Sequence, residues 1–299
     1  MKERVIEDEF ASGRLDKYLS DWLELSRSET LGLLEGGYVR LNNRKITIKQ
    51  KGHSLQSGDV LTVSEFRPAG AKRIFPNDGL ELKLITDQPN YVVVNKAAGM
   101  NIIPKSESEK DTVLNALLAR YPQIQGVGEG GLRSGIVHRL DKDTSGVLIV
   151  VKTQERWQSL REAFAKHKSQ KIYHAIVEGK PRKTGKAEMN LIVARHKPAK
   201  VRVLPYGSRQ SRLCDLSWRV LEEYKKHSLL EIRLGSGFLH QIRVMMAELG
   251  YPLLADELYG SPSHIASRQM LHAFSIQIDD ILAQASYPTD FHNAITQLV

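Results

Sequence analysis

The run His138–Gly146 places a carboxylate, Asp141, two residues after a cation, Arg139, in a short polar segment between apolar residues. Ile136-Val137 precedes the segment and Val147–Val151 follows it, and we interpret both as buried strands. If the chain before Asp141 is extended, Arg139 and Asp141 point to the same face, because strand side chains alternate. The pattern therefore predicts a fixed carboxylate at the end of a rigid sheet, able to act as nucleophile or base beside a guanidinium.

Other interpretations of this segment remain open. An Arg-x-Asp taken alone is usually a solvated ion pair of little energetic value. Asp141 and Asp143 could also form a metal-binding Asp-x-Asp pair, which would suit metal-dependent cleavage of RNA. No cluster of His, Asp or Glu has convincing metal spacing, so we expect no metal site.

The first 66 residues predict a small domain of two helices followed by a small sheet. Ser26–Glu29 has the form of a capping box and opens the second helix, which Gly36-Gly37 ends. The apolar positions at helical spacing in the first helix are Leu15, Tyr18, Leu19, Trp22 and Leu23. The strands expected after the helices are Tyr38–Leu41, one near Ile46, and Val60–Val63, with Asn42-Asn43 as a hairpin turn.

A group of cations lies along this hairpin with no acid between them: Arg40, Arg44, Lys45, Lys49 and Lys51. Such a one-sided group suits contacts to phosphates, which fix the register of a nucleic acid without reading its bases. The alternative is an exposed hairpin with ordinary solvated lysines.

Composition and charge favour a protein that binds a polyanion and does not enter the membrane. The chain of 299 residues has a net charge of +9 and an isoelectric point near 9.5, which favours a polyanionic partner. Residues 152–212 carry 16 basic and 4 acidic side chains, more than the whole excess. The N-terminus has no apolar core, Cys214 is the single cysteine, and no apolar run approaches the ~20 residues needed to span a bilayer. We therefore expect a cytoplasmic protein that does not enter the membrane.

The pattern changes after a linker that we place at residues 67–80, where Pro68, Gly70, Pro76 and Gly79 break regular structure. In residues 81–299, apolar runs and helical stripes alternate irregularly rather than in a βαβ rhythm. We expect α+β architecture with a mostly antiparallel, mixed sheet. The elements expected there are strands at 91–96, 173–177 and 229–234, and helices at 113–121, 157–164 and 240–249.

Four passages together resemble the pseudouridine synthases of the RluA type. The run His138–Gly146 is similar to the signature that carries the essential aspartate of this family, and Lys171–Gly179 to the motif of the active-site tyrosine. His240–Val244 resembles the motif of an active-site arginine, and Val94–Met100 the first family motif, with Ala97 in place of proline. Leu254–Gly260 and Leu271–Ala273 match later signatures. The N-terminal segment resembles the small RNA-binding domain shared by a small-subunit ribosomal protein and tyrosyl-tRNA synthetases, which we name the S-four-like domain (residues 1–66).

The resemblance implies isomerisation of uridine to pseudouridine in RNA, with large-subunit ribosomal RNA as the expected substrate. Asp141 would be the catalytic carboxylate, Arg243 its partner, and Tyr173 an aromatic face for uracil and a hydroxyl for proton transfer. Arg139 would fill the stack left by a flipped uridine. Further RNA contacts are expected from His138, Lys171 and Gln241. The isomerisation gains no atoms and changes no oxidation state, so we expect no cofactor, and we expect a monomer.

One departure from the family pattern bears on the substrate. The family usually has an Arg-Thr pair before His-Gln, whereas this chain has Phe238-Leu239. Two apolar side chains replace a cation and a hydroxyl, which favours a second hypothesis: a non-catalytic RNA-binding or ribosome-assembly factor on the same fold.

Overall fold

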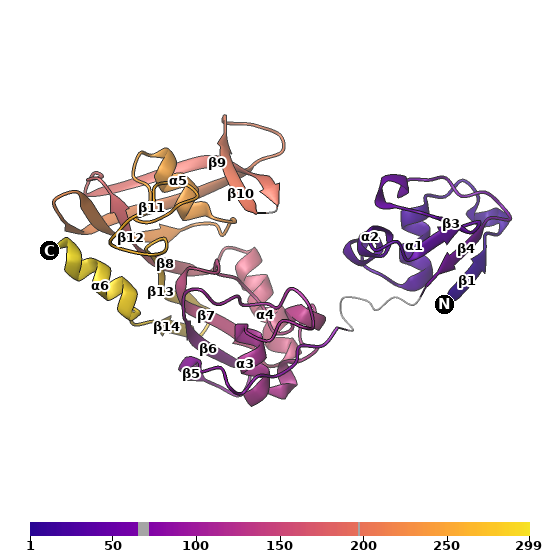
Figure 1. Cartoon of the computed structure of the whole chain (residues 1–299), viewed down its shortest axis with the longest axis horizontal. Helices are drawn as coiled ribbons and strands as arrows, with labels where there is room; N and C mark the ends of the chain where they lie inside the picture. Colours follow the sequence, from indigo (N-terminus) through magenta and orange to yellow (C-terminus); the bar gives the residue numbers. More distant parts are fainter. Residues whose placement is uncertain (65–71, 197) are drawn as a thin grey trace. The chain divides into compact units, whose positions relative to one another are not determined.

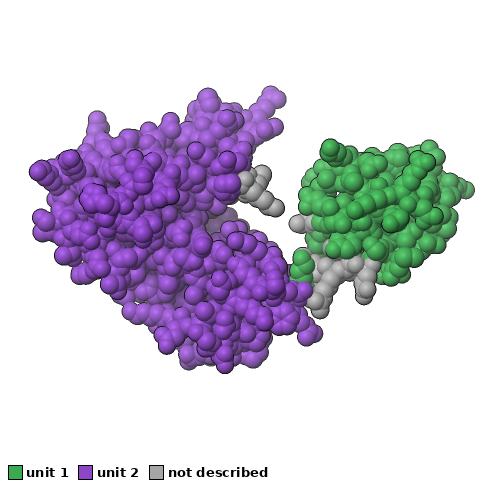
Figure 2. All heavy atoms as spheres, in the orientation of Figure 1, with its two compact units in different colours: residues 1–72 green, residues 73–299 purple. Residues whose placement is uncertain are grey.

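The computed structural model describes residues 1–64, 72–196 and 198–299 (Figure 1). The chain divides into two compact units, residues 1–72 and 73–299 (Figure 2). Of the predicted linker, residues 67–71 lie outside the described residues. Within the described ranges, no helix has the length and apolar character that crossing a membrane requires.

The first unit packs two helices on a four-stranded sheet of order β1-β4-β2-β3. Its elements are β1 (Lys2–Val5), η1 (Asp8–Phe10), α1 (Leu15–Leu23), α2 (Arg27–Glu35), β2 (Val39–Leu41), β3 (Arg44–Lys45), η2 (Ile48–Gln50) and β4 (Val60–Val63). The capping box at Ser26 and Glu29 is confirmed, since each accepts from the backbone N–H of the other. Asn42 and Asn43 have φ of 50° and 63°, as a tight β2–β3 turn requires.

The second unit is built on one large sheet of order β10-β9-β11-β12-β8-β13-β7-β6-β5, with β14 paired to β13. Among the strands of the described residues, only β13 and β7 run parallel, so the prediction of an α+β fold with a mostly antiparallel sheet is confirmed. The strands are β5 (Lys83–Asp87), β6 (Tyr91–Lys96), β7 (Ser145–Val151), β8 (Gln170–Glu178), β9 (Thr184–His196), β10 (Ala199–Leu204), β11 (Arg212–Glu223), β12 (His227–Leu234), β13 (Leu271–Ile278) and β14 (Ile281–Gln284). The helices are α3 (Val113–Arg120), η4 (Pro122–Ile124), η5 (Gly131–Arg133), α4 (Gln154–Ala165), α5 (Gln241–Glu248) and α6 (Thr289–Leu298).

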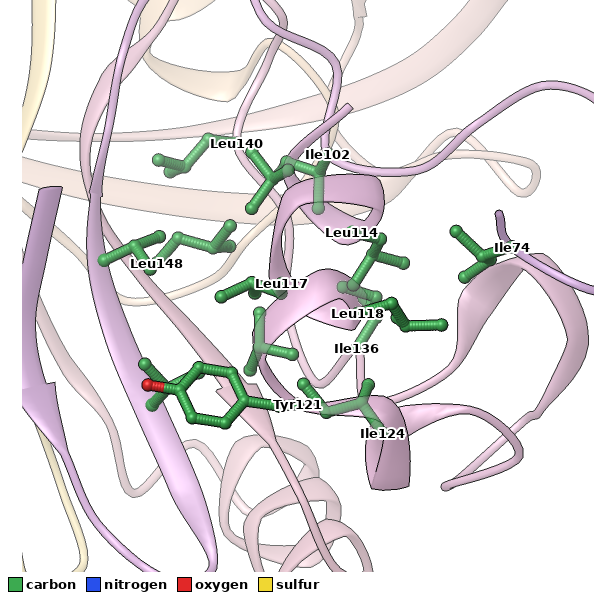
Figure 3. Close-up of a cluster of buried hydrophobic side chains, with 14 of the residues drawn as sticks. Ile74, Ile102, Leu114, Leu117, Leu118, Tyr121, Ile124, Ile136, Leu140 and Leu148 are labelled. Atoms are coloured by element: carbon green, nitrogen blue, oxygen red, sulfur yellow. The ribbon is translucent and has the colours of Figure 1, made fainter. Parts of the chain in front are cut away.

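Strand β7 is the rigid base of the segment that carries Asp141, because all residues of the strand are buried. Leu148 and Val150 belong to the apolar cluster around α3, whereas Val147, Ile149 and Val151 belong to the cluster that includes α4 residues. The alternation explains why an uninterrupted apolar run forms a strand covered on both faces. Figure 3 shows the α3 cluster, in which Leu148 lies with Leu140, the residue next to Asp141.

The expected strand at Ile136-Val137 is wrong. Only one isolated bridge joins Ile136 to Val150. Side chains of α4 bind the carbonyl oxygens instead: Trp157 Nε1 donates to that of Ile136 at 3.0 Å, and Arg161 Nη1 to that of Val137 at 3.5 Å. Asp141 therefore lies in a loop between this bridge and β7, and the residues before it do not form the expected strand.

Candidate active site

Asp141 lies on the wall of a pocket of about 460 Å³. Its side chain is 22% exposed, so it reaches solvent although its loop is anchored by buried Leu140. The backbone N–H of Thr144 donates to the carbonyl of Asp141 at 3.1 Å, which tightens the turn into β7. The walls come from the loop before β7, from α4, from β8 and from the segment that leads into α5; they include His138, Arg139, Asp141, Arg161, Phe164, Lys171, Tyr173, Arg212, Phe238, Leu239, His240 and Arg243.

Arg243, on α5, joins two carboxylates. Its Nε and Nη2 donate to both oxygens of Asp256 at 2.7 and 2.9 Å, and its Nη1 lies 3.4 Å from Asp141 Oδ2. Burial alone would lower the pKa of Arg243, but the hydrogen bond and charge of Asp256, with that of Asp141, raise it above its ordinary value. The guanidinium therefore stays charged in a mostly buried position and faces Asp141.

His240 approaches the same carboxylate from the N-terminal end of α5. Its Nε2 lies 3.9 Å from Asp141 Oδ2, and its Nδ1 lies 3.0 Å from the hydroxyl oxygen of Tyr259. That oxygen accepts from the backbone N–H of Val201 at 2.8 Å, so the Tyr259 hydroxyl can donate to Nδ1 and leave the imidazole proton on Nε2. Burial is the largest influence on His240 and lowers its pKa, although Asp141 opposes this. The His240 ring is therefore neutral, and its Nε2–H group faces Asp141.

Tyr173 comes from β8, where it pairs with Ile232 of β12 and Ala273 of β13. It lines the pocket together with Asp141. Burial first, and then the negative charge of Asp141, raise the pKa of the Tyr173 phenol well above its ordinary value. Its hydroxyl is therefore protonated at neutral pH.

The structure places His138 and Lys171 on the pocket wall, each with a partner in the protein. His138 Nε2 accepts from the backbone N–H of Ile149 at 3.0 Å, and its ring packs near that of Phe164. Burial, with a smaller contribution from Lys171, lowers the pKa of His138 to about 3, so this ring is neutral. Lys171 Nζ donates to the carbonyl of Ser236 at 2.8 Å.

Gln241 is buried, and its amide group is committed to the chain itself. Its Oε1 accepts from the Ser236 hydroxyl at 2.8 Å and the Phe238 N–H at 2.9 Å, and its Nε2 donates to the carbonyl of Asp215 at 2.8 Å. This geometry favours a role in shaping the segment before α5 over the direct RNA contact that the motif suggests. Arg139, in contrast, is exposed and lines the pocket, as a residue that contacts RNA would.

The cations of the S-four-like domain lie on the β2–β3 hairpin, on η2 and directly after η2. Arg40 is directly opposite Lys45 in the register of the two strands, and both side chains are exposed. Like charges in this position repel each other. An anion between them would remove the repulsion, which suits a phosphate contact by this group of Arg40, Arg44, Lys45, Lys49 and Lys51.

Sequence reasoning missed three polar residues of this region. Asp256 and Tyr259 lie in the run Leu254–Gly260, whose resemblance to a family signature was the available signal. Lys96 lies in the first motif; it is fully buried, and burial lowers its pKa to about 7. Within the described residues, no group of three or more His, Cys, Asp or Glu side chains could hold a metal ion.

Comparison with known proteins gives a consistent result. Residues 90–248 match the family model of RNA pseudouridylate synthases. The chain is 34% identical over 301 residues to an uncharacterized RNA pseudouridine synthase of Synechocystis sp., covering 95% of this chain and 89% of that protein. It is 32% identical over 309 residues to the ribosomal large subunit pseudouridine synthase D of Neisseria meningitidis serogroup B, covering 97% and 80%.

Solved structures agree on the fold. Human RNA pseudouridylate synthase domain containing 4 superposes with a TM-score of 0.58 at 20% identity, covering 72% of this chain and 92% of that one. Human RNA pseudouridylate synthase domain containing 1 gives a TM-score of 0.57 at 22% identity, covering 73% and 87%. The fold, the matched family model and the extent of these identities show that this chain belongs to the RNA pseudouridine synthases, of the RluA type, and is an isomerase that acts on RNA.

Proposed function

We propose that this enzyme isomerises uridines of large-subunit ribosomal RNA and that Asp141 is its catalytic carboxylate. The observation that carries the assignment of Asp141 is its position 3.4 Å from Arg243 in a pocket that also holds Tyr173. The ribosomal substrate is supported by the names of relatives such as the Neisseria synthase, which matches this chain over nearly its whole length.

In the proposed reaction the N1–C1′ bond of uridine breaks, the uracil turns over, and a C5–C1′ bond forms. Asp141 acts on the ribose, either by attack at C1′ or by removal of the C2′ proton. The proton at C5 is then lost and N1 gains a proton, so atoms and electrons balance without a cofactor. The Arg243 guanidinium faces Asp141 and holds its carboxylate toward the ribose when the bound base excludes water.

Tyr173 has two parts in this proposal. Its ring is a face for the uracil, and its hydroxyl takes part in removing the C5 proton. A protonated phenol can accept that proton only as it releases its own. In this proposal Asp141, free again once the C5–C1′ bond has formed, accepts the released proton and gives it up to solvent as N1 takes one, which restores the carboxylate. The Tyr173 hydroxyl is thus a relay rather than a free base.

The pocket walls also suit a flipped nucleotide. Arg139, Lys171 and Arg212 bring cations to the pocket wall, which suits the phosphates beside the target uridine. Phe238 and Leu239 add an apolar edge on which a base can lie. We propose that Arg139 enters the stack that the flipped uridine leaves.

The test has two arms on the full-length chain. Pseudouridine is mapped across cellular RNA from strains with and without the gene, and loss at a position in large-subunit ribosomal RNA is expected; loss only in another RNA would overturn the substrate assignment. The purified Asp141→Asn variant is expected to give no product while binding RNA normally. Asp143→Asn, two residues away, is the matched control and should remain active. Product from Asp141→Asn would overturn the catalytic assignment.

A further inference from the structure

The turn that carries Asp141 is held by two buried basic side chains, one from each side of β7. Lys96, at the end of β6, donates from Nζ to the carbonyls of Lys142 at 2.7 Å, Ala97 at 2.7 Å and Met100 at 2.9 Å. Arg268, just before β13, donates from Nη1 to the carbonyl of Asp143 at 2.9 Å. The two consecutive carbonyls directly after Asp141 therefore each accept a hydrogen bond from a buried basic side chain.

Each nitrogen of the Arg268 guanidinium has hydrogen-bond acceptors within the protein. Its Nη1 also donates to the carbonyls of Gln269 at 3.1 Å and Leu271 at 3.2 Å, and its Nη2 lies 3.4 Å from the hydroxyl oxygen of Ser145, the first residue of β7. The side chain is only 8% exposed. Its orientation is therefore set by the protein and leaves no donor for RNA.

The carboxylate that orients Arg268 belongs to the C-terminal helix. Asp290, in the first turn of α6, accepts from Arg268 Nε at 2.6 Å and from Nη2 at 3.1 Å. Helix α6 is itself anchored by Phe291 and Ala294, both fully buried in a cluster with residues of β8 and β12. In Figure 1, α6 is the yellow helix that ends the chain.

A second contact ties the C-terminal segment to the same turn. His272 Nε2 lies 3.2 Å from the carbonyl of Ala285, and its Nδ1 lies 2.9 Å from the Ser145 hydroxyl. The carbonyl can only accept, so Nε2 carries the imidazole proton and Nδ1 accepts from Ser145. Residues 285–290 therefore reach the base of the catalytic turn through Arg268 and through His272.

We propose that Arg268, oriented by Asp290, is a positioning residue that fixes the turn bearing Asp141, so that the C-terminal helix sets the catalytic rate without touching RNA. The inference rests on the proposed role of Asp141. A carboxylate that must meet C1′ or C2′ of a flipped nucleotide has to be held within about 0.5 Å. Both residues lie beyond the range 90–248 that the family model matches.

The decisive variant is Asp290→Asn, which is almost isosteric and alters a side chain that is 45% exposed. A matched control exists in the same unit: Arg156, 11% exposed, pairs with Asp279 (43% exposed) and Asp280, but donates no hydrogen bond to the turn. The double variant Asp279→Asn, Asp280→Asn therefore removes comparable ion pairs elsewhere. Arg268→Lys and Arg268→Ala complete the set.

The assay uses the full chain and total RNA from a strain lacking the gene, at positions where the wild-type enzyme restores pseudouridine. At saturating enzyme, the single-turnover rate of Asp290→Asn should fall by about 10- to 100-fold, the loss that a misplaced catalytic group produces. RNA affinity and thermal midpoint should match those of the Asp279, Asp280 control, which should keep the wild-type rate. Arg268→Lys should be faster than Arg268→Ala.

A rate for Asp290→Asn equal to that of the control would overturn the positioning role. So would a loss that appears only as weaker RNA binding. If Arg268→Ala fails to fold, Asp290→Asn still decides. Asp141→Asn, measured in parallel, separates the two proposals: an active Asp141→Asn refutes the proposed catalytic residue, whereas an inactive one beside a fully active Asp290→Asn refutes only this inference.

Discussion

Asp256 determines where the partner of Asp141 lies. It is fully buried and accepts from Arg243 through both oxygens, and Oδ1 also accepts from the backbone N–H groups of Leu258 and Tyr259. The guanidinium is thereby fixed on two of its edges, and Nη1 is left for Asp141. A planar, two-pronged group is needed for this arrangement, because a lysine offers a point charge that cannot bind both carboxylates in fixed directions.

Arg139 and Arg243 should fail in different ways. Arg243→Ala leaves Asp141 without its charge partner, so activity should be lost on every RNA, and Arg243→Lys should restore only part of it. Arg139→Ala leaves the carboxylate competent and should mainly hinder base flipping, so a substrate whose target uridine is already unstacked should restore its rate. Single-turnover rates on structured and unstructured RNA test this. Equal responses of the two alanine variants would contradict the division of roles.

Replacing Tyr173 by phenylalanine separates the ring from the hydroxyl. Burial and Asp141 raise the pKa of this phenol, so in the proposed reaction it would act as a proton relay rather than as an ionised base. Tyr173→Phe should therefore bind RNA as the wild type does but form product roughly 10²- to 10⁴-fold more slowly, the range for loss of a proton-transfer group. Substrate deuterated at C5 should report the same step: the isotope effect should increase in the variant. A wild-type rate for Tyr173→Phe would show that the hydroxyl is not needed and that only the aromatic ring of this residue contributes.

Among the elements, helices with a clear apolar stripe and strands with a long apolar run were predictable from the sequence. Helix α3 has an apolar stripe and a capping Thr112, and β6 and β7 contain the unbroken apolar runs 91–94 and 147–151. Strands β9 and β11 were not predicted, because polar and charged residues interrupt their apolar positions. They are the half-buried part of the sheet, where only alternate residues such as Leu191, Cys214 and Leu216 join a core.

The residues of the candidate site that lie in a recognisable motif were predictable from the sequence. Asp141, Tyr173 and Arg243 come together in one pocket although they lie far apart in the chain. The pairing of buried partners was not predictable: a family signature marks the run that holds Asp256, but no local pattern pairs Asp256 with Arg243 or Asp290 with Arg268. Such pairs depend on how loops and helices meet in space, which local patterns do not encode.

Gly146 shows how closely two elements meet below the catalytic turn. It has φ of 116°, and an added Cβ would clash with the backbone carbonyl of Ala273 on β13. Gly146→Ala should lower the free energy of unfolding by more than about 2 kcal/mol, because both strain and a backbone clash must be relieved. Gly99→Ala is the control: its φ is 81° with nothing within 4 Å, so only about 1 kcal/mol of strain is expected. Denaturant unfolding measures both, and equal losses would contradict the close-approach explanation.

At the scale of the whole molecule, buried histidines should make the larger unit lose stability as the pH falls. Burial lowers the pKa of His174 and of His272 to about 4, and that of His138 to about 3, from 6.5. The folded state therefore resists protonation while the unfolded chain binds protons. The stabilisation is present above pH 6.5 and is lost as pH falls toward 4, by up to about 1.4 kcal/mol per pH unit for each histidine.

The measurement is the free energy of unfolding of the full chain across this pH range. His272→Asn should reduce the slope by the equivalent of one proton, whatever it does to the absolute stability. His264→Asn, which replaces an exposed histidine outside the buried core, is the control with which the slope of His272→Asn is compared. A slope that His272→Asn does not alter would assign the acid sensitivity to other groups.

Because the chain has two units, we expect the first unit to contribute mainly to RNA binding and the second to carry out the reaction. The first unit offers the cations Arg40 to Lys51, whereas Asp141, Tyr173 and Arg243 all lie in the second. Deleting residues 1–72 should weaken RNA binding but leave the single-turnover rate at saturating enzyme within a few-fold of the wild type.

The binding carried by the first unit should come largely from the release of counterions. The deletion should therefore flatten the plot of log affinity against log salt by about 0.7 to 0.9 for each phosphate that the first unit neutralises. Arg40→Gln with Lys45→Gln should flatten it in part, and should not destabilise the first unit, since the pair repels across the hairpin. Lys2→Gln with Lys17→Gln removes the same charge elsewhere in the unit and serves as the control. If the control flattened the slope as much as the hairpin variant, the contribution would belong to total charge and not to the hairpin.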